Sequence, residues 1–286
     1  MKKYIPWQIV IIAKIVLSKL PFDYRFWQGL GLFKHGHMAN PEYAFKVFTE
    51  HFNRVDFQRK KNEFVALELG PGDSLFSAII AHSFGATRCY MVDAGHFASE
   101  EKEPYESLVK MIKDKDISFD IDEQVSLADL VKECGGVYYT NGLNSLREIP
   151  TQSVDFIWSQ AVLEHIRLHE FEETLRELRR VLRPDGVCSH RVDLKDHLGG
   201  GLNNLRFGHR YWEAEWMASS GFYTNRIRFK KMVNSFADAG FEVQAIKKDE
   251  WPEVPIRNNK LAPEFRKINN EDLLVSGFDV ILKPVD

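Results

Sequence analysis

The stretch Glu63–Gly72, with the sequence EFVALELGPG, is a short apolar run that ends in two glycines around a proline. Such a run, closed by turn residues, is typical of a buried strand followed by a tight turn. A helical pattern over Ser74–Phe84 and a second apolar run over Thr87–Val92 come next. A strand, a helix and another strand in this order predict a right-handed βαβ unit, in which the two strands are parallel.

The alternation of strand and helix patterns continues along the rest of the chain. Helical patterns are found at Phe171–Leu182 and Arg228–Ala239, part of Glu100–Cys134 is expected to be helical, and the glycine-rich Lys195–Phe207 is expected to be a long loop. Further strand patterns lie at Val137–Thr140, Val154–Ser159, Val187–Val192, Phe241–Ile246 and Gly277–Leu282. We therefore expect an α/β fold with a parallel sheet, in which the last two strands form an antiparallel hairpin at the edge.

Composition places the chain among ordinary globular proteins. Its 286 residues are 44% hydrophobic and 28% charged, enough for a full three-layer core. The net charge of −3 gives no electrostatic reason to expect a nucleic-acid partner. Cys89, Cys134 and Cys188 are widely spaced, so neither a disulfide framework nor a zinc site is expected, and a cytoplasmic location fits best.

An apolar stretch, Tyr4–Leu20, follows the first three residues. Lys14 interrupts it, no small-residue cleavage site follows, and it is short for a membrane span, which needs about 20 apolar residues. Two interpretations stay open. One is a helix that packs on the domain as a lid over an active site. The other is peripheral contact of residues 1–20 with the inner face of a membrane, through the lysines Lys2, Lys3, Lys14 and Lys19.

The glycine turn and an acid at the end of the next strand form a ligand-binding pattern. Gly70 and Gly72 let the backbone approach a ligand closely, and the carboxylate of Asp93 can accept both ribose hydroxyl protons of a nucleoside. The third glycine of a pyrophosphate-binding turn is absent, since Asp73-Ser74-Leu75 follow Gly72. Glu68 suits an ammonium group better than a pyrophosphate; the alternative is that it caps a helix or pairs with a surface lysine.

Three motifs, occurring in the right order, carry a family resemblance. Glu68–Gly72 (ELGPG) resembles the first motif of class I S-adenosylmethionine-dependent methyltransferases. Ser153–Ile166 (SVDFIWSQAVLEHI) resembles a segment of their small-molecule branch. Leu178–Gly186 (LRRVLRPDG) resembles the helix and turn that follow it, with Asp185 in place of the usual glycine. The resemblance covers about residues 62 to 195 and the closing strands.

The resemblance implies a Rossmann-like three-layer sandwich, with a seven-stranded, mostly parallel sheet and one antiparallel edge strand. It also implies S-adenosylmethionine as the cofactor. The residues that it assigns to the methionine part are Glu68, Gly70, Pro71 and Gly72. It assigns Asp93 to the ribose and either Asn141 or Gly142 to the adenine, in a stretch that is longer than the family's usual loop. Next to the sulfonium it places Ser159 and Gln160.

Methyl transfer to a hydroxyl group needs a base as well as alignment. Candidate bases should lie at the carboxyl ends of the fourth and fifth strands, where His165, Asp193 and His197 are found, with Asp196 as a further acid. The alternative for His165 is a structural histidine bonded to nearby backbone. No metal is expected in this region, because His190 and Asp193 lie three apart on a strand and would face opposite sides.

The segment Trp212–Arg228 is rich in aromatics and polar donors, which suit a sugar or a carboxylated or phosphorylated metabolite. The alternative is that its aromatics only pack the segment onto the sheet. The whole chain also resembles uncharacterised methyltransferases near bacterial surface-glycan genes, which favours a sugar hydroxyl as the acceptor. Two other classes compete: an NAD-type oxidoreductase, which the missing third glycine disfavours, and a non-catalytic cofactor-binding or membrane-associated module.

These expectations divide the chain into two parts. Residues 1–60 form an N-terminal helical and aromatic cap, or a membrane-associating segment. Residues 61–286 form the cofactor-binding domain, with an insertion on the substrate side at about residues 194–228. The side chains that suit a cap over a pocket are Trp27, Phe33, His35, His37 and Tyr43.

Overall fold

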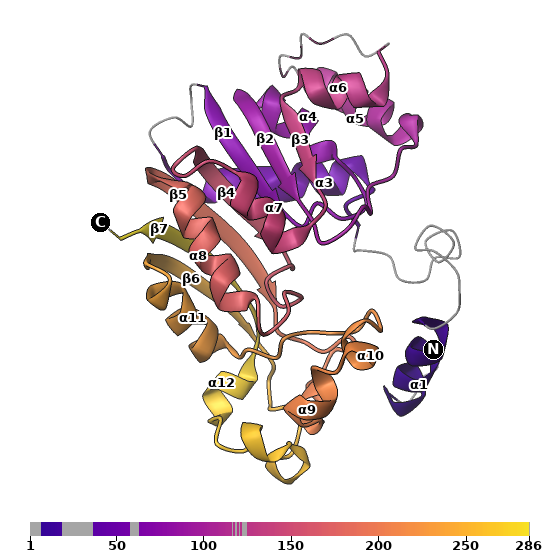
Figure 1. Ribbon diagram of the computed structural model, residues 1–286, viewed down its shortest axis with the longest axis vertical. Coiled ribbons are helices and arrows are strands. Elements are labelled where there is room, and N and C mark those ends of the chain that lie inside the picture. The colour runs from indigo at the N-terminus through magenta and orange to yellow at the C-terminus, as the bar shows by residue number, and fades with distance from the viewer. Residues whose placement is uncertain are drawn as a thin grey trace.

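The computed structural model describes residues 7–18, 37–57, 63–115, 117, 119, 121 and 125–285. Its centre is a seven-stranded sheet in the order β3-β2-β1-β4-β5-β7-β6 (Figure 1). The strands are β1 (Phe64–Leu69), β2 (Ala86–Val92), β3 (Gly136–Tyr139), β4 (Val154–Gln160), β5 (Leu182–Asp193), β6 (Phe241–Glu250) and β7 (Val275–Pro284). Every strand pattern in the sequence is therefore a strand, and the expected α/β sandwich is confirmed.

One strand of the sheet runs against the others. Strands β1 to β5 pair in parallel, whereas β7 is antiparallel both to β5 and to β6. The expected hairpin is present, but the antiparallel strand is one place in from the edge, and β6 forms the edge itself. Because β7 lies between β5 and β6, the backbone N–H and C=O groups on both of its sides are hydrogen-bonded.

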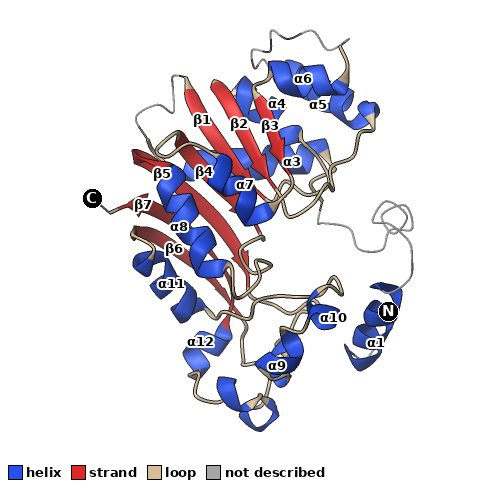
Figure 2. Ribbon diagram, viewed as in Figure 1, coloured by secondary structure: helices blue, strands red, loops and turns tan. Residues whose placement is uncertain are grey.

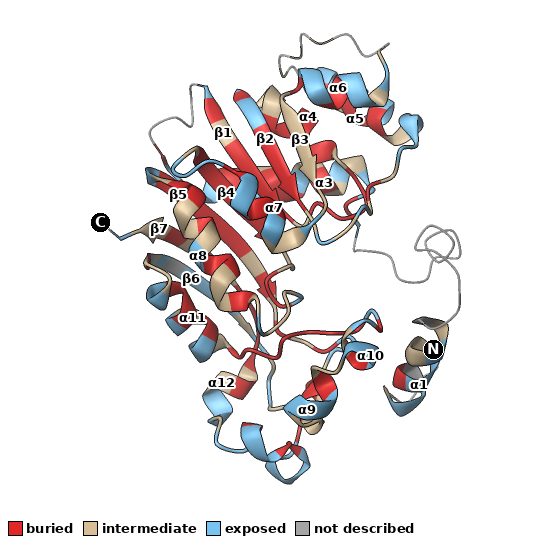
Figure 3. Ribbon diagram, in the orientation of Figure 1, coloured by how far each residue is buried: buried red, intermediate tan, exposed pale blue. Residues whose placement is uncertain are grey.

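Helices cover both faces of the sheet (Figure 2). One face carries a core that includes Phe48, Phe64 and Trp158, under α3 (Pro41–Arg54), α4 (Phe76–Ser83) and α5 (Lys102–Asp114). The other face carries a core under α7 (Gly142–Glu148), α8 (Phe171–Val181) and α11 (Phe229–Asp238). Figure 3 shows the central strands as the most completely buried part of the molecule, as expected for a parallel sheet that is covered on both faces.

Two segments depart from the sequence expectations, and Glu100–Cys134 is helical in part, as expected. The stretch that was expected to be a loop near the adenine contains α7. Glu100–Cys134 contains α5 and the shorter α6 (Leu127–Glu133). Helix α8 ends at Val181 and β5 starts at the next residue, because the Arg183–Gly186 turn lies within the strand as a register irregularity against β4.

The insertion after β5 is built from short elements: a 3-10 turn (Asn203–Arg206), α9 (His209–Trp212) and α10 (Glu215–Ala218). Helix α1 (Trp7–Ser18) packs on it, with Ile11 in one apolar cluster with Leu198, Trp212 and Phe222. A second small core lies beneath α12 (Asn270–Leu274) and the connection before it. Among the cap residues, Trp27, Phe33 and His35 lie outside the described residues.

Candidate functional site

The glycine turn after β1 is closely packed against the loop after β4. Gly70 has φ +74° and Gly72 has φ +68°, a left-handed conformation that L side chains rarely adopt. A Cβ atom at Gly70 would lie 2.5 Å from Cγ2 of Val162. Both the backbone angle and the close approach therefore require glycine at Gly70, and the pattern in the sequence is a structural necessity here.

Asp93 is hydrogen-bonded to two of the other predicted cofactor residues, Gly72 and Gly142. Its Oδ2 accepts a hydrogen bond from the Gly72 N–H at 3.0 Å, and its Oδ1 accepts one from the Ala94 N–H at 2.7 Å. The Gly142 N–H donates to the Asp93 carbonyl at 2.8 Å. The backbone amides hold the carboxylate in one orientation at the edge of the sheet, next to the turn that begins α7 at Asn141. Gly72, Asp93 and Gly142 are therefore brought together as one group.

Glu68 lies in the sheet interior, only 1% exposed. Burial raises the pKa of its carboxyl to about 8, the charge of Asp93 adds to the rise, and a hydrogen bond with Ser77 opposes it. Its Oε2 has no hydrogen-bond partner among the described residues. A buried carboxyl with an unused oxygen is suited to a cation, so the site fits the ammonium of a methionine group. The alternative, a pair with a surface lysine, is wrong because the side chain is buried.

Ser159 and Gln160, at the end of β4, point to opposite faces of the sheet. The Ser159 hydroxyl is hydrogen-bonded to Nδ1 of His190 at 2.7 Å, and Oε1 of Gln160 is hydrogen-bonded to Nε2 of His51 at 3.0 Å. The other ring nitrogen of His51 is hydrogen-bonded to Ser189 at 2.8 Å. Burial lowers the pKa of His51 to about 4 and that of His190 to about 3, so both rings are neutral. Both strand-end side chains thus take part in an internal network, and their place beside the sulfonium stays a prediction.

The loop after β4 leads from the glycine turn to a pair of histidines. Val162 touches Gly70, and three residues later the ring of His165 lies 4.8 Å from the ring of His197, at 72° between planes. Nδ1 of His165 donates to the Tyr223 carbonyl at 2.8 Å. A backbone contact was the structural alternative for this histidine, and it makes Nδ1 the donor nitrogen of the ring.

His197 lies in the loop after β5. Partial burial lowers the pKa of its ring, and the ammonium of Lys14 lowers it further. Asp196 shapes the turn: its carboxylate accepts the backbone N–H groups of Leu198, Gly200, Gly201 and Asn203. Because these hydrogen bonds occupy its lone pairs, Asp196 is not suited to be a base. It stabilises the turn that positions His197.

Asp193, the third candidate base, lies at the end of β5. Its Oδ1 accepts the Lys195 N–H at 2.9 Å, and the Lys195 ammonium lies 3.3 Å away. Its own N–H donates to Oε1 of Glu164 at 3.1 Å. The carboxylate is therefore close to the histidine pair in the chain but already paired with a cation.

Sequence reasoning missed Glu164. It is 2% exposed, burial raises the pKa of its carboxyl to about 8, and its Oε2 has no partner in the described parts of the chain. It links the loop that carries His165 to the end of β5, through the Asp193 N–H. The only signal in the sequence is an acid inside a mostly apolar stretch, directly before His165.

The polar residues of the insertion, expected to face a substrate, are used inside the protein. Asn225 donates to the carbonyls of Leu163 and Ile166 at 2.8 and 3.1 Å. Arg226, with φ +62°, donates to the Phe207 carbonyl, and Arg228 donates to the Leu194 carbonyl at 2.9 Å. The packing alternative holds for these residues, because all three are at most 5% exposed.

No grouping of histidine, cysteine, aspartate or glutamate that could hold a metal ion is found among the described residues. His190 is buried, and its Nδ1 is hydrogen-bonded to Ser159. The same parts of the chain contain no helix that is both long and apolar enough to cross a membrane.

Comparison with known proteins bears on this geometry. A methyltransferase-domain family matches residues 106–189, a range that includes His165 but neither the glycine turn nor Asp93. The comparison with curated proteins gave no match.

Solved structures share the fold at low identity. A chain from the complex between the Haloferax volcanii Trm112 methyltransferase activator and a methyltransferase is 13% identical, with a TM-score of 0.50 over 94% of this chain and 100% of that one. S-adenosylmethionine-dependent methyltransferases from Mesorhizobium loti (15% identical, TM-score 0.43, 78% of this chain and 92% of that one) and Listeria monocytogenes (12%, 0.45, 85% and 100%) are also similar. The Rossmann-like sheet and the matched methyltransferase domain together support an S-adenosylmethionine-dependent methyltransferase.

Proposed function

We propose that the enzyme transfers the methyl group of S-adenosylmethionine to a hydroxyl oxygen of a small-molecule or glycan acceptor, with a sugar hydroxyl as the preferred class. The observation that carries this proposal is the His165–His197 pair, which stands at the end of the loop that touches the glycine turn. Hydroxyl acceptors need a base, and an imidazole close to the cofactor site can supply one.

The proposed cofactor contacts lie at the carboxyl ends of the parallel strands. Glu68 faces the ammonium of the methionine part, with Gly70 and Gly72 giving backbone access, and Asp93 accepts the ribose hydroxyls. Gly142, which bonds to the Asp93 carbonyl, borders the adenine. When bound, the cofactor supplies an electrophilic methyl group and a thioether leaving group.

The chain's own residues handle the acceptor's proton. His165 donates through Nδ1 to the Tyr223 carbonyl, so Nε2 takes the proton from the hydroxyl as its oxygen bonds to the methyl carbon. His197 packs against the same ring, and the lowered pKa of His197 keeps a second positive charge away from it near neutral pH. Asp193 is the alternative base, and its ion pair with Lys195 argues for His165 first.

A radiolabelled methyl-transfer assay tests the proposal with a panel of monosaccharides, nucleotide sugars and glycolipids. We expect His165→Ala to lower kcat by about 10²–10⁴-fold while the Kd for S-adenosylmethionine stays unchanged. His169→Ala is the matched control, because His169 lies on the same loop with an exposed side chain.

Full turnover by His165→Ala would remove the histidine from the mechanism and favour Asp193, which Asp193→Asn then tests. Binding of S-adenosylmethionine without methylation of any hydroxyl acceptor would favour the non-catalytic module. Tighter calorimetric binding of NAD than of S-adenosylmethionine would overturn the proposal as a whole.

A further inference from the structure

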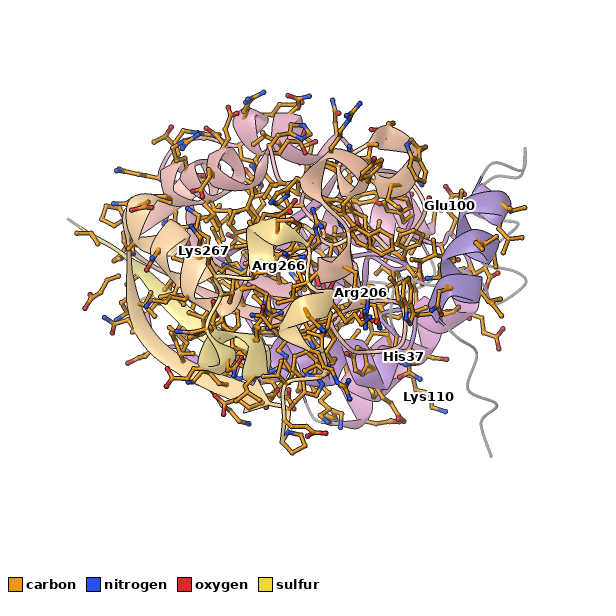
Figure 4. The ribbon with its side chains drawn as sticks, turned by 90° about the horizontal axis from the view of Figure 1, so that it is seen from below. His37, Glu100, Lys110, Arg206, Arg266 and Lys267 are labelled. Carbon is orange, nitrogen blue, oxygen red and sulfur yellow. The ribbon has the colours of Figure 1, made fainter. Side chains whose placement is uncertain are left out.

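Helix α1 is apolar along almost its whole length and has two different faces. The inner face packs on the insertion: Ile11 is buried in the cluster with Trp212, and the Trp7 ring lies 5.9 Å from Phe207. Arg206, labelled in Figure 4, lies 5.5 Å from the centre of the Trp7 ring. Nζ of Lys14 donates to the Gly221 carbonyl at 3.4 Å, so this lysine also points inward. The contacts fix which side of α1 faces the protein.

The outer face of α1 is apolar and exposed. Ile9, Ile12 and Val16 are 55%, 63% and 55% exposed, and their spacing of three and four residues places them on one side of the helix. Tyr211 and Trp216, on the adjacent α9 and α10, are 61% and 45% exposed. Elsewhere in the described parts of the chain, large hydrophobic side chains are exposed only at Ile246 and Val285. Helices α9 and α10 lie beside α1 (Figure 1). Exposed apolar side chains are therefore concentrated in this part of the molecule, and such a concentration marks an interaction surface.

The size of this face limits its partner. With 12 residues, α1 is about 18 Å long, too short for the bilayer core of about 30 Å. A stable protein interface needs about 800 Å² and 20–30 residues from each partner, whereas the exposed set on α1, α9 and α10 has five large hydrophobic side chains. A helix lying in a lipid surface buries only one such stripe, so the set suits a membrane better than a second protein.

Charge points the same way. Residues 1–22 contain four lysines and no acidic residue, whereas the whole chain has a net charge of −3. Lys2 and Lys3 come before α1 and Lys19 follows it, so the helix is bracketed by basic residues in the sequence. Basic residues beside an apolar helix attract anionic headgroups, and tryptophan and tyrosine favour the interface between headgroups and acyl chains.

We propose that the outer face of α1 docks on the surface of an anionic lipid bilayer, with the helix lying in the plane of the membrane and Tyr211 and Trp216 beside it. The two interpretations of the N-terminal segment are then compatible, because the inner face packs on the insertion and the outer face meets lipid. The proposal does not depend on the methyl acceptor.

Co-sedimentation of the full chain with vesicles tests it. Wild type is expected to bind vesicles of phosphatidylglycerol and phosphatidylcholine, and to bind less well as salt rises or phosphatidylglycerol is left out. The variant Ile9→Gln/Ile12→Gln/Val16→Gln is expected to bind at least about tenfold more weakly, since it removes three exposed apolar side chains that would enter the lipid. Glutamine is chosen because it retains helix propensity.

Ile246→Gln/Val285→Gln is the matched control, since it removes exposed apolar side chains on the sheet and should bind vesicles like wild type. An unchanged S-adenosylmethionine Kd and an unchanged melting temperature in the triple variant would show that only the surface had been altered. Equal vesicle binding by wild type and the triple variant would overturn the proposal. So would absence of wild-type binding, or a wild-type dimer in light scattering that the triple variant abolishes.

Discussion

The proposed cofactor side and the proposed acceptor side of this protein are built in different ways. The cofactor side comes from the ends of β1 and β2 and the start of α7, and its contacts join Gly72, Asp93 and Gly142 through backbone amides. The acceptor side comes from distant segments: Lys14, His165, His197 and Tyr223 meet across more than 200 residues of sequence.

The two sides depend on different kinds of contact. Neighbouring parallel strands bring their carboxyl ends to one edge of the sheet, so short motifs are enough to build the cofactor side. The acceptor side depends on side chains such as Asn225, which bonds to two carbonyls of the loop that carries His165. Substitutions that alter the backbone conformation, such as those of a turn glycine, should therefore damage the cofactor side. Substitutions of buried side chains should damage the acceptor side.

The largest effect is expected from Gly70→Ala. A residue with a Cβ in the left-handed region costs about 1–2 kcal/mol, and the clash with Val162 adds about 1–3 kcal/mol. We expect urea unfolding to show a loss of this order and calorimetry to show no binding of S-adenosylmethionine. Gly200→Ala is the control, since Gly200 has φ +77° but no atom within 4 Å of an added Cβ. Equal losses of stability in both variants would contradict the close-packing argument.

Asp93→Ala should follow. It removes the acceptor for the ribose and for the Gly72 and Ala94 N–H groups, so the free energy of S-adenosylmethionine binding should weaken by about 1.5–3 kcal/mol for each lost bond to the carboxylate. Asp93→Asn keeps one oxygen acceptor and should fall between wild type and the alanine variant. Calorimetric titration measures all three proteins. Unchanged affinity in Asp93→Ala would show that the ribose is held elsewhere.

A smaller effect, on the acceptor side, is expected from Asn225→Ala. It leaves the Leu163 and Ile166 carbonyls and the Ile227 N–H without this partner, which should lower the free energy of unfolding by about 2 kcal/mol. Because the His165 loop loses its support, kcat should fall while the S-adenosylmethionine Kd is kept. Asn258→Ala, at an exposed site, should change neither quantity. A weakened cofactor Kd in Asn225→Ala would break the distinction between the two sides.

The smallest effect, taken per pH unit, is the pH dependence of stability. The pKa of Glu68 is raised from 4.5 to about 8, so the folded protein holds a proton that the unfolded chain releases. Stability from this proton is fully present below pH 4.5 and is lost as pH rises through 8, at up to about 1.4 kcal/mol per pH unit. Glu164, with its pKa also raised to about 8, acts in the same direction. Chemical denaturation of the cofactor-free enzyme from pH 7 to 9 should show falling stability, because this window lies above the range in which His51 and His190, with their lowered pKa values, oppose the two glutamates.

Cofactor binding supplies the sharper readout of the same group. If Glu68 faces the ammonium, binding at pH 7 should release about one proton, seen by calorimetry in buffers of different ionisation enthalpy. Glu68→Gln should abolish this release, whereas Glu164→Gln should keep it. Proton release that persists in Glu68→Gln would assign the ammonium to another group.

Much of the fold could be predicted from local patterns. The seven strand patterns are all strands, because each is a short apolar run closed by turn residues. The place of β7 inside the edge could not be predicted, since a hairpin pattern does not say which of its strands pairs with β5. Helix α7 was missed because it is only seven residues long and has too little periodicity to be detected.

Predictions for the site fared unevenly for a similar reason. The structure brings Gly72, Asp93 and Gly142 together, and it pairs His165 with His197. The sequence left open whether the donors of the insertion face a substrate or pack inside the protein, because composition cannot distinguish an exposed arginine from one that holds a carbonyl, as Arg226 and Arg228 do. Glu164 could not be selected from the sequence, because what distinguishes it is the burial of its carboxyl group, which no short motif specifies.

By itself, the sequence determined the βαβ order, the glycine turn after β1 and the acid at the end of β2. These features depend on the stereochemistry and polarity of neighbouring residues, which the order of amino acids specifies directly. Only the tertiary structure decided that Glu68 is buried with an unused oxygen, that Asn225 supports the His165 loop, and that α1 has an inner and an outer face. Those properties arise from packing between segments far apart in the chain, where many local patterns are compatible with different contacts.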